Sequence, residues 1–286
     1  MTRTVFLNGT FMPYEEACLP IMERGFLFAD GIYEVSAVVN GRLVDNEAHL
    51  ARFDRSLREI RIPNPYSAAE WTKLEEELVR RNGLQEGTVY MQVTRGVAER
   101  DFAFPKDAKP TVVMFTQAGD IVNAPAARMG VAVITVPDLR WKRRDIKSVA
   151  LLAQVLAKQA AAEAGVAEAW MVEDGYVTEG SSSTAFIITS EGGIVTRPLS
   201  NAVLPGITRL SVMQLAREAG LTIEERLFTV EEAHAAAEVF LTSASRFVFP
   251  VVTIDGRQVA DGKPGALTRR LRELYLDMSG ARPAKT

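Results

Sequence analysis

The sequence has few of the residues on which several kinds of site depend. Its 286 residues include one cysteine, Cys18, and two histidines, His49 and His234. A single cysteine excludes an intrachain disulfide and a cysteine metal cluster, and it is typical of a protein from a reducing cytoplasm. Two isolated histidines argue against a multi-histidine metal site and against a Ser-His-Asp triad. We therefore expect no metal and a cytoplasmic location.

Long apolar runs and a surplus of one charge are also missing. No segment stays apolar over the length that a membrane helix needs, and residues 1–4 lead into a strand pattern rather than a secretion signal. Lys and Arg number 33 against 36 Asp and Glu, so the net charge of -3 gives no long-range attraction to nucleic acid or anionic membrane. The basic stretch 140–144 is interpreted as a solvated edge. A small molecule is the expected partner, with no nucleic acid and no membrane.

What the sequence does contain indicates two domains. Hydrophobic residues make up 47% of the chain, which at this length favours two separate cores. Strand and helix patterns are intermixed, which predicts an α+β fold. Periodicity is lost and turn formers collect at 119–128, where we expect a linker. The predicted domains are therefore an N-terminal α+β domain over 1–118 and a C-terminal domain over 129–286.

Short signals predict where several elements begin and end. Asn8-Gly9 and Asn40-Gly41 favour tight hairpin turns, because this dipeptide readily adopts the positive φ angles that such turns need. Asn46 is expected to cap the helix that carries Arg52 on one face. The spacing of capping boxes at helix starts is present in two pairs of residues, Ser67 with Glu70 and Thr229 with Glu232.

Two further predictions place a lysine and a glutamate on regular elements. Residues 149–164 are rich in alanine and leucine and predict a helix that Ser148 can cap, which would put Lys147 at a helix N-terminus. Residues 176–178 predict a strand that follows a tight turn and ends at Glu179. Rigid elements would therefore hold both side chains.

Lys147 and Glu179 together have the residue types that pyridoxal phosphate chemistry requires. A partly desolvated amine has a lowered pKa and a nucleophilic neutral fraction, so Lys147 is the candidate for the Schiff-base lysine. A carboxylate facing the cofactor's pyridine nitrogen keeps that nitrogen protonated, which lets the ring accept electron density from the substrate. Taken alone, either residue is more often a surface charge or a turn residue.

A set of motifs in a fixed order supports this pairing. They are Ala29-Asp30-Gly31-Ile32-Tyr33-Glu34, Gln92-Val93-Thr94-Arg95-Gly96, Asp145-Ile146-Lys147-Ser148, Thr178-Glu179-Gly180-Ser181-Ser182-Ser183 and Leu204-Pro205-Gly206-Ile207-Thr208-Arg209. Over nearly the whole chain this set resembles that of the class IV aminotransferases, most closely the D-amino-acid transaminases. The resemblance implies a fold-type IV enzyme. Its smaller N-terminal α/β domain would accompany a larger C-terminal domain with a mixed, barrel-like sheet surrounded by helices.

The resemblance also implies a cofactor site. Pyridoxal 5'-phosphate would be bound by Lys147 and Glu179, and its phosphate by Arg52, Ile207 and Thr208. Backbone N–H groups at the start of a helix suit such a dianion. Further cofactor contacts are expected from Ser183, Ser243 and Ala244. The family often has a threonine where this chain has Ala244, so Ser243 or Ser245 is expected to replace that contact.

The substrate site is implied in the same way. Tyr33, Arg100 and Phe102 match the residues that bind the substrate carboxylate in related D-amino-acid enzymes, and Ser182 is a further substrate contact. In those enzymes the Arg100 loop comes from the neighbouring subunit, which implies a homodimer. The position of Phe102 is usually histidine there. Phenylalanine cannot donate a hydrogen bond, so a weaker carboxylate site and a wider substrate range are expected.

We therefore predict a transaminase that moves amino groups between D-amino acids, such as D-alanine, and 2-oxo acids, such as 2-oxoglutarate and pyruvate, by ping-pong kinetics. The alternatives that share the fold are an (R)-selective amine transaminase, aminodeoxychorismate lyase and a branched-chain aminotransferase. A non-catalytic binding protein on the same scaffold is a different class of alternative, and retention of both Lys147 and Glu179 argues against it.

Overall fold

The computed structural model describes residues 3–281, and the chain divides into two compact units. The first unit comprises Met1–Asp120 and Ile146–Ala150, and the second comprises Ile121–Asp145 and Leu151–Thr286. The division at 120/121 lies inside the predicted linker 119–128, part of which forms the short helix α4 (Pro125–Met129). The segment Ile146–Ala150 lies well beyond that linker and yet belongs to the first unit.

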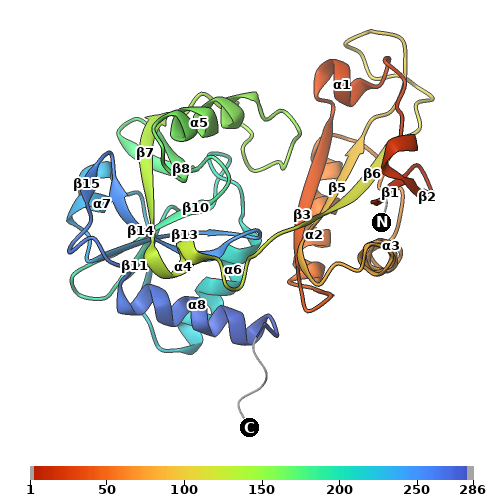
Figure 1. The fold of residues 1–286 in the computed structure, drawn as a ribbon. Helices are drawn as coiled ribbons and strands as arrows, with labels where there is room; N and C mark the ends of the chain where they lie inside the picture. The colour runs from red at the N-terminus through yellow and green to blue at the C-terminus, as the bar shows by residue number, and fades with distance from the viewer. Residues whose placement is uncertain (1–2, 282–286) are drawn as a thin grey trace. The chain divides into compact units, whose positions relative to one another are not determined.

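The first unit is a six-stranded antiparallel sheet with helices (Figure 1). Its strand order is β2-β1-β6-β5-β3-β4. The strands are β1 (Thr4–Leu7), β2 (Thr10–Pro13), β3 (Gly31–Val39), β4 (Arg42–Leu43), β5 (Glu86–Thr94) and β6 (Thr111–Ala118). The helices are the 3-10 turn η1 (Tyr14–Glu16), α1 (Arg24–Phe28), α2 (Asn46–Glu59) and α3 (Ala68–Asn82).

The alternation of side chains along β5 explains how this unit forms its core. Val89, Met91 and Val93 are fully buried against α2 and α3, whereas the intervening Tyr90 and Gln92 are half-buried on the opposite face. A strand with period-2 alternation buries one face only. The helices supply the matching apolar stripe through residues such as Leu50, Phe53, Leu57, Trp71 and Leu78.

The second unit is built on a nine-stranded mixed sheet in the order β12-β11-β10-β13-β14-β7-β8-β9, with β15 paired to β14. The strands are β7 (Val131–Pro137), β8 (Glu168–Glu173), β9 (Tyr176–Gly180), β10 (Thr184–Ile188), β11 (Ile194–Thr196), β12 (Ile223–Glu225), β13 (Glu238–Ser243), β14 (Phe247–Ile254) and β15 (Arg257–Gln258). The longer helices are α5 (Leu152–Glu163), α6 (Ile207–Glu218), α7 (Val230–Ala235) and α8 (Ala266–Met278).

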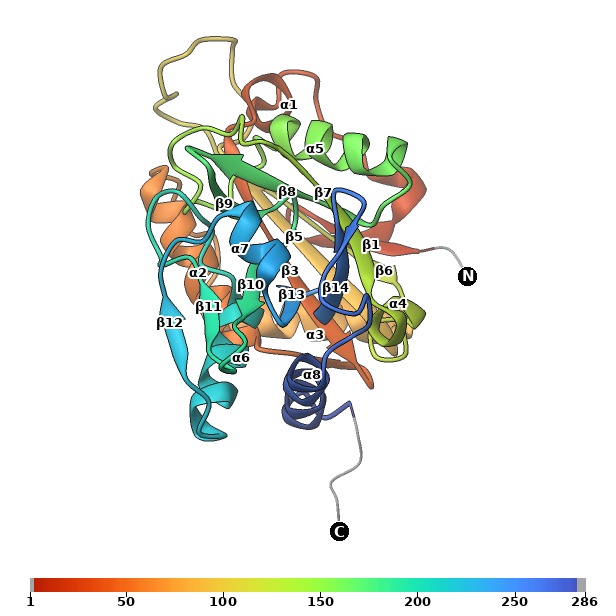
Figure 2. The same cartoon turned by 90° about the vertical axis from the view of Figure 1, so that its left-hand side faces the viewer.

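This second sheet curls back on itself (Figure 2). β9 lies at one end of the strand order, yet only Ser181–Ser183 separate it from β10, which lies near the other end. A connection that short requires the two ends to approach each other, as in a barrel. The enclosed core includes Trp170, Phe228 and Leu241, and α5 packs on the outside through Ala157 and Ala161.

Several of the local predictions are confirmed. Asn8 and Asn40 have positive φ angles of 48° and 51° in their hairpin turns, each followed by a glycine of positive φ. The capping box of Ser67 with Glu70 begins α3, and the box of Thr229 with Glu232 begins α7. These signals act within a few residues, so the rest of the fold does not override them.

Two predictions about helix starts are wrong. Asp45, in the left-handed conformation, precedes α2, and Asn46 is the first helical residue, whose side chain donates to Thr72 Oγ1. The helix expected from Val149 begins at Leu152. Residues 147–149 instead pair with the edge of β3, through hydrogen bonds from Tyr33 N to Lys147 O and from Val149 N to Gly31 O. Backbone pairing with a distant strand here outweighs local helix propensity.

Candidate active site

Lys147 belongs to the first unit, where backbone pairing with β3 fixes its position. Its carbonyl accepts from Tyr33 N at 2.9 Å, and its own N–H donates to Ser56 Oγ at 3.4 Å. The ammonium Nζ lies 4.2 Å from the centroid of the Tyr33 ring, a cation–π arrangement. No carboxylate within residues 3–281 forms an ion pair with Lys147. Lys147 is half-buried, and its amine has no acidic side chain as a counter-ion in the described chain.

The ring of Tyr33 is held by a column of aromatic side chains on the same face of the sheet. It stacks on Tyr90 with a centroid separation of 5.6 Å, and Tyr90 stacks on Phe115 at 4.6 Å. Burial raises the pKa of the Tyr90 phenol, so that group stays neutral. The structure therefore brings Lys147 and Tyr33 together, as the predicted site requires.

Arg52 is buried and paired, in contrast to a solvated helix arginine. Its Nε donates to Glu34 Oε1 at 2.7 Å, and its Nη2 donates to Glu34 Oε2 at 2.8 Å. His49 Nδ1 lies 2.8 Å from the same Oε2 atom. Burial alone would raise the pKa of Glu34, but Arg52 and His49 outweigh it and hold that pKa well below the usual range. Arg52 is thus fixed to β3, with its charge compensated.

Arg100 and Phe102 lie on an exposed loop of the first unit. Phe102 is 79% exposed, and its ring centroid lies 5.5 Å from that of Phe28. The Arg100 guanidinium is 5.4 Å from the Phe28 centroid and 5.7 Å from the Phe102 centroid. In the part of the chain that the structure describes, Arg100 has no carboxylate partner. Its guanidinium can therefore donate hydrogen bonds to a carboxylate.

Glu179 lies in the second unit, within β9 rather than beyond the end of a strand. Its side chain is 6% exposed. Arg140 Nη1 donates to Oε1, and Leu204 N donates to Oε1 at 3.1 Å and to Oε2 at 3.3 Å. Burial raises the pKa of Glu179, and the Arg140 charge opposes that rise. A buried carboxylate with one lightly bonded oxygen suits a ligand that donates one hydrogen bond.

The predicted phosphate residues Ile207 and Thr208 form the first turn of α6. Gly206 precedes the helix and provides no side-chain cap, so the first-turn N–H groups of Ile207 and Thr208 point outward without helical acceptors. A Cβ on Gly206 would lie 2.8 Å from Thr184 Oγ1, so a larger residue would fill this approach. Such a helix start binds anions well.

Ser243 gives a second observation that bears on whether these residues suit a phosphate. Its Oγ atom is buried and has no hydrogen-bond partner among residues 3–281. Buried hydroxyls are nearly always paired, so an orphan of this kind points to an absent polar ligand. Ala244 beside it has no hydroxyl to offer. The residues of the second unit therefore fit a phosphate and a ring nitrogen, as pyridoxal phosphate would present them.

Sequence reasoning missed the carboxylate that orders the serines after Glu179. Glu168 is fully buried and accepts from the hydroxyls of Ser181, Ser182 and Ser183, the last two at 3.0 and 3.3 Å. Ser182 is exposed, whereas Ser183 is buried. Glu168 stands at the start of a strand with no motif around it, so only the three-dimensional fold reveals this role.

The interpretation of 140–144 as a solvated edge is also wrong. The Arg140 and Arg144 side chains are only 5% and 1% exposed, and they pair with the buried carboxylate of Asp138. Lys142 matches the expectation, at 85% exposed.

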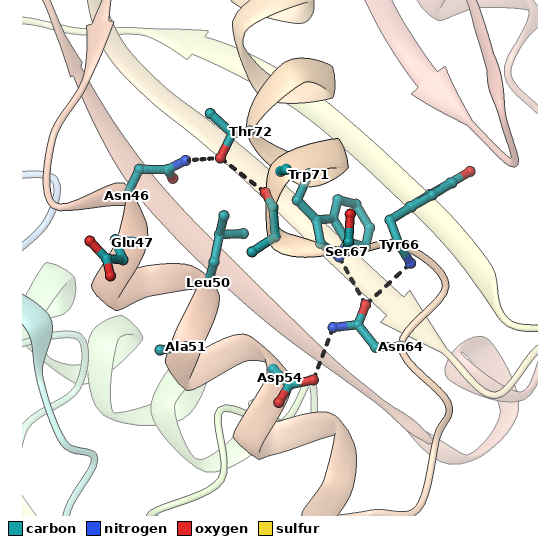
Figure 3. Close-up of a pocket in the computed structure, with 12 residues that line it drawn as sticks. Asn46, Glu47, Leu50, Ala51, Asp54, Asn64, Tyr66, Ser67, Trp71 and Thr72 are labelled. Atoms are coloured by element: carbon teal, nitrogen blue, oxygen red, sulfur yellow. Dashed lines mark hydrogen bonds between the residues drawn. The ribbon is translucent and has the colours of Figure 1, made fainter.

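A groove of about 830 Å³ in the first unit is lined by residues of α2, of α3 and of the segment between them (Figure 3). None of the predicted site residues lines it. Its polar groups bond one another: Asn64 Nδ2 donates to Asp54 Oδ1 at 3.1 Å, and Trp71 Nε1 donates to Asn64 Oδ1 at 2.9 Å. A groove whose polar groups are already satisfied offers a ligand little, and we assign it no role.

Known proteins resemble this chain over most of its length. The family model for amino-transferase class IV matches residues 31–254. A D-alanine aminotransferase of Staphylococcus aureus is 42% identical over 272 residues, which cover 94% of this chain and 95% of that protein. A D-alanine aminotransferase of Bacillus licheniformis is 39% identical over 284 residues, covering 99% of each.

Solved structures agree. The branched-chain aminotransferase of the thermophilic archaeon Thermoproteus uzoniensis, solved with norvaline, superposes with a TM-score of 0.86 at 26% identity, covering 99% of this chain and 96% of that one. The Escherichia coli branched-chain enzyme, at 22% identity and a TM-score of 0.89, covers 100% of this chain and 97% of that one and shares the fold. The predicted α+β fold of fold-type IV enzymes is therefore confirmed, and the predicted family with it: this chain belongs to the class IV aminotransferases.

Proposed function

We propose that this chain is a pyridoxal-phosphate transaminase that transfers amino groups between D-amino acids, such as D-alanine, and 2-oxo acids. The observation that carries the reaction type is the half-buried amine of Lys147, which has no acid partner within residues 3–281. The preference for D-amino acids is supported by the relatives named D-alanine aminotransferase.

Pyridoxal 5'-phosphate, when bound, supplies an aldehyde that bonds reversibly to amines and a ring that accepts electron density from the substrate α-carbon. Glu179 would hold the ring nitrogen through its lightly bonded Oε2 atom. The first-turn amides of Ile207 and Thr208, the Ser243 hydroxyl and Arg52 would hold the phosphate. Ser183 and Ala244 would make further contacts with the cofactor.

Lys147 has the central role in the proposal. Its Nζ atom would hold the cofactor and, as a free amine, would act as the base and then the acid that moves the proton of the substrate α-carbon. The Tyr33 ring at 4.2 Å would orient that amine. Two successive half-reactions through one site give ping-pong kinetics.

Tyr33, Arg100, Phe102 and Ser182 would form the substrate site, with the Arg100 loop entering the site of a second copy of the chain. Arginine binds a carboxylate through two parallel hydrogen bonds. A homodimer is supported by the apolar side chains that the first unit leaves exposed near this loop and α1: Ile21 is 78% exposed, Phe26 80% and Phe102 79%. Monomers rarely expose so many large apolar residues together.

A cytoplasmic location completes the proposal. The one cysteine, Cys18, is exposed and free, which suits a reducing compartment. No helix within residues 3–281 has the length and apolarity to cross a membrane.

An (R)-selective amine transaminase is the second candidate, and Phe102 favours it. Phenylalanine offers no hydrogen-bond donor to a substrate carboxylate. An amino-donor screen with pyruvate or 2-oxoglutarate decides between the two candidates. Both enantiomers of several amino acids and of 1-phenylethylamine are the donors. Strict dependence on a D-amino acid supports the first candidate, and comparable turnover of (R)-1-phenylethylamine supports the second.

Borohydride reduction of the holoprotein tests the shared chemistry. The reduced adduct should map to the peptide that contains Lys147, and Lys147→Ala should abolish it. Lys142→Ala is the matched control, because Lys142 lies five residues away and is exposed. An adduct on another lysine, or none, would overturn the proposal.

A further inference from the structure

The contacts of Glu179 leave its two oxygens unequal. Oε1 accepts from Arg140 Nη1 and, at 3.1 Å, from Leu204 N. Oε2 accepts only the longer contact from the same amide, at 3.3 Å, within the described chain. Since a carboxylate oxygen has two lone pairs, Oε2 is the atom with room for a further donor.

Arg140 is itself fixed by a second buried carboxylate. Its Nε donates to Asp138 Oδ1 at 3.0 Å, and its Nη2 donates to Asp138 Oδ2 at 2.7 Å. The Thr178 hydroxyl donates to the same Oδ2 atom at 2.6 Å. The guanidinium therefore bridges two carboxylates, and its planar fork permits only one orientation at each.

The charges around this bridge are balanced by residues of the second unit. Arg144 Nη1 lies 3.2 Å from Asp138 Oδ2 and donates to Glu173 Oε2 at 2.8 Å. Arg197 is the further cation that acts on Glu173, Asp138 and Glu179. The carboxylates of Asp138, Glu173 and Glu179 thus face the guanidinium groups of Arg140, Arg144 and Arg197. Of these three cations, all within the described residues 3–281, Arg140 alone bonds Glu179 directly.

We propose that Arg140 is a positioning residue that keeps Glu179 ionised and leaves Oε2 for the ring nitrogen, so that Asp138, Arg140 and Glu179 together set how firmly that nitrogen holds its proton. This inference rests on the proposed function. The proton can lie on the ring nitrogen, opposite a carboxylate, or on Oε2, opposite a neutral ring. A cation bonded to Oε1 stabilises the carboxylate and therefore favours the protonated ring.

The 15N chemical shift of the ring nitrogen, followed against pH in holoprotein loaded with 15N-labelled cofactor, tests this proposal. Arg140→Gln should lower the pKa of the ring nitrogen by roughly 1–3 units, the range expected for removing an opposite charge at contact distance. Arg140→Lys should restore most of the shift. Asp138→Asn should act in the opposite direction, because it removes a carboxylate that competes for Arg140.

Arg143→Gln is the matched control, because Arg143 pairs with Asp145 and is 36% exposed. Its ring-nitrogen pKa should equal that of the wild type. Should Arg140→Gln fold and bind cofactor with an unaltered 15N titration, the inference is overturned. If Arg140→Gln does not fold, Asp138→Asn with an unchanged or lowered pKa overturns it instead. A wild-type protein that forms no adduct at Lys147 fails the proposed function, which is a separate result.

Discussion

Glu34 in the first unit and Glu179 in the second are both buried glutamates held by an arginine, yet their contacts differ. Arg52 bonds both oxygens of Glu34, and His49 adds a further contact. Arg140 bonds only one oxygen of Glu179. Accordingly the pKa of Glu34 lies below its ordinary range, whereas that of Glu179 lies above it. A carboxylate whose two oxygens are both bonded by protein groups serves as a counter-ion within the fold. A carboxylate with one weakly bonded oxygen can bind a ligand.

Glu75 extends the comparison to a buried carboxyl group whose oxygens are not bonded by an arginine. It is fully buried on α3, and neither oxygen has a hydrogen bond of good geometry within residues 3–281. Burial raises its pKa to about 8, although Asn46 and Ser36 partly offset the shift. At neutral pH it is therefore largely protonated. Burial raises the pKa of each of these three carboxyl groups, and their partners decide whether the net shift is upward or downward.

The largest expected effect is on folding and comes from Glu34, the glutamate whose two oxygens are both bonded by Arg52. Glu34→Gln removes the charge that compensates Arg52 inside the first unit, and breaking a buried ion pair costs about 3–5 kcal/mol. Urea denaturation at pH 7 measures the loss. Asp54→Asn, on the helix that carries Arg52, is the control, because the exposed Asp54–Arg58 pair is worth at most about 1 kcal/mol.

The pH dependence of the same variant gives a second check. Because the folded pKa of Glu34 lies below 4.5, its contribution is present above pH 4.5 and is lost as the pH falls toward the lowered value. Glu34→Gln should lack this acid-side loss. Equal stability of wild type and variant across the whole pH range would contradict the role assigned to Glu34.

The next effect is on catalysis and comes from Glu179, the glutamate with one weakly bonded oxygen. Glu179→Gln should reduce kcat by about 10²–10³-fold, the usual cost of removing an oriented electrostatic contact, because the amide cannot hold a proton on the ring nitrogen. Steady-state kinetics with D-alanine measure it. The exposed Glu224→Gln is the control. Urea denaturation should show a smaller loss than for Glu34→Gln, and the reverse order would break the comparison.

A further effect on folding, which depends on pH, is expected from Glu75. Its folded pKa of about 8 exceeds its ordinary value of 4.5, so the folded state binds the extra proton between these values. Stability should therefore fall by roughly 1.4 kcal/mol per pH unit as the pH rises from about 4.5 to about 8. Glu75→Gln should remove this slope and be more stable than wild type at pH 9. A variant with an unchanged slope in urea denaturation would show that Glu75 is not its source.

The sequence alone is sufficient where a signal is local or belongs to a motif. The Asn-Gly turns and the capping boxes depend on neighbouring residues, and they form as predicted. The motif set identifies the family, and it selects Lys147 and Glu179 without any knowledge of their surroundings.

Contacts between distant segments were not predictable in this way. Lys147 is held by backbone hydrogen bonds to β3, and such bonds leave no mark on side-chain identity. The partners of Glu179 and of the serines, Arg140 and Glu168, come from other elements, and neither is part of the motifs. A charge run looks the same in the sequence whether its members are solvated or buried, so the pairing of Arg140 and Arg144 had to come from the fold.

The smallest expected effect concerns Arg100. In the first unit it is a cation with no carboxylate partner within residues 3–281, just as Glu179 in the second unit is an anion with one weakly bonded oxygen. Phe102→His adds a hydrogen-bond donor beside it, and one neutral hydrogen bond is worth about 1 kcal/mol, or roughly a 5-fold change. KM for D-alanine should fall by that factor, while KM for (R)-1-phenylethylamine, which has no carboxylate, should not. Phe104→His, two residues along the same loop, is the control. An equal change for both donors would mean that position 102 acts on packing rather than on carboxylate binding.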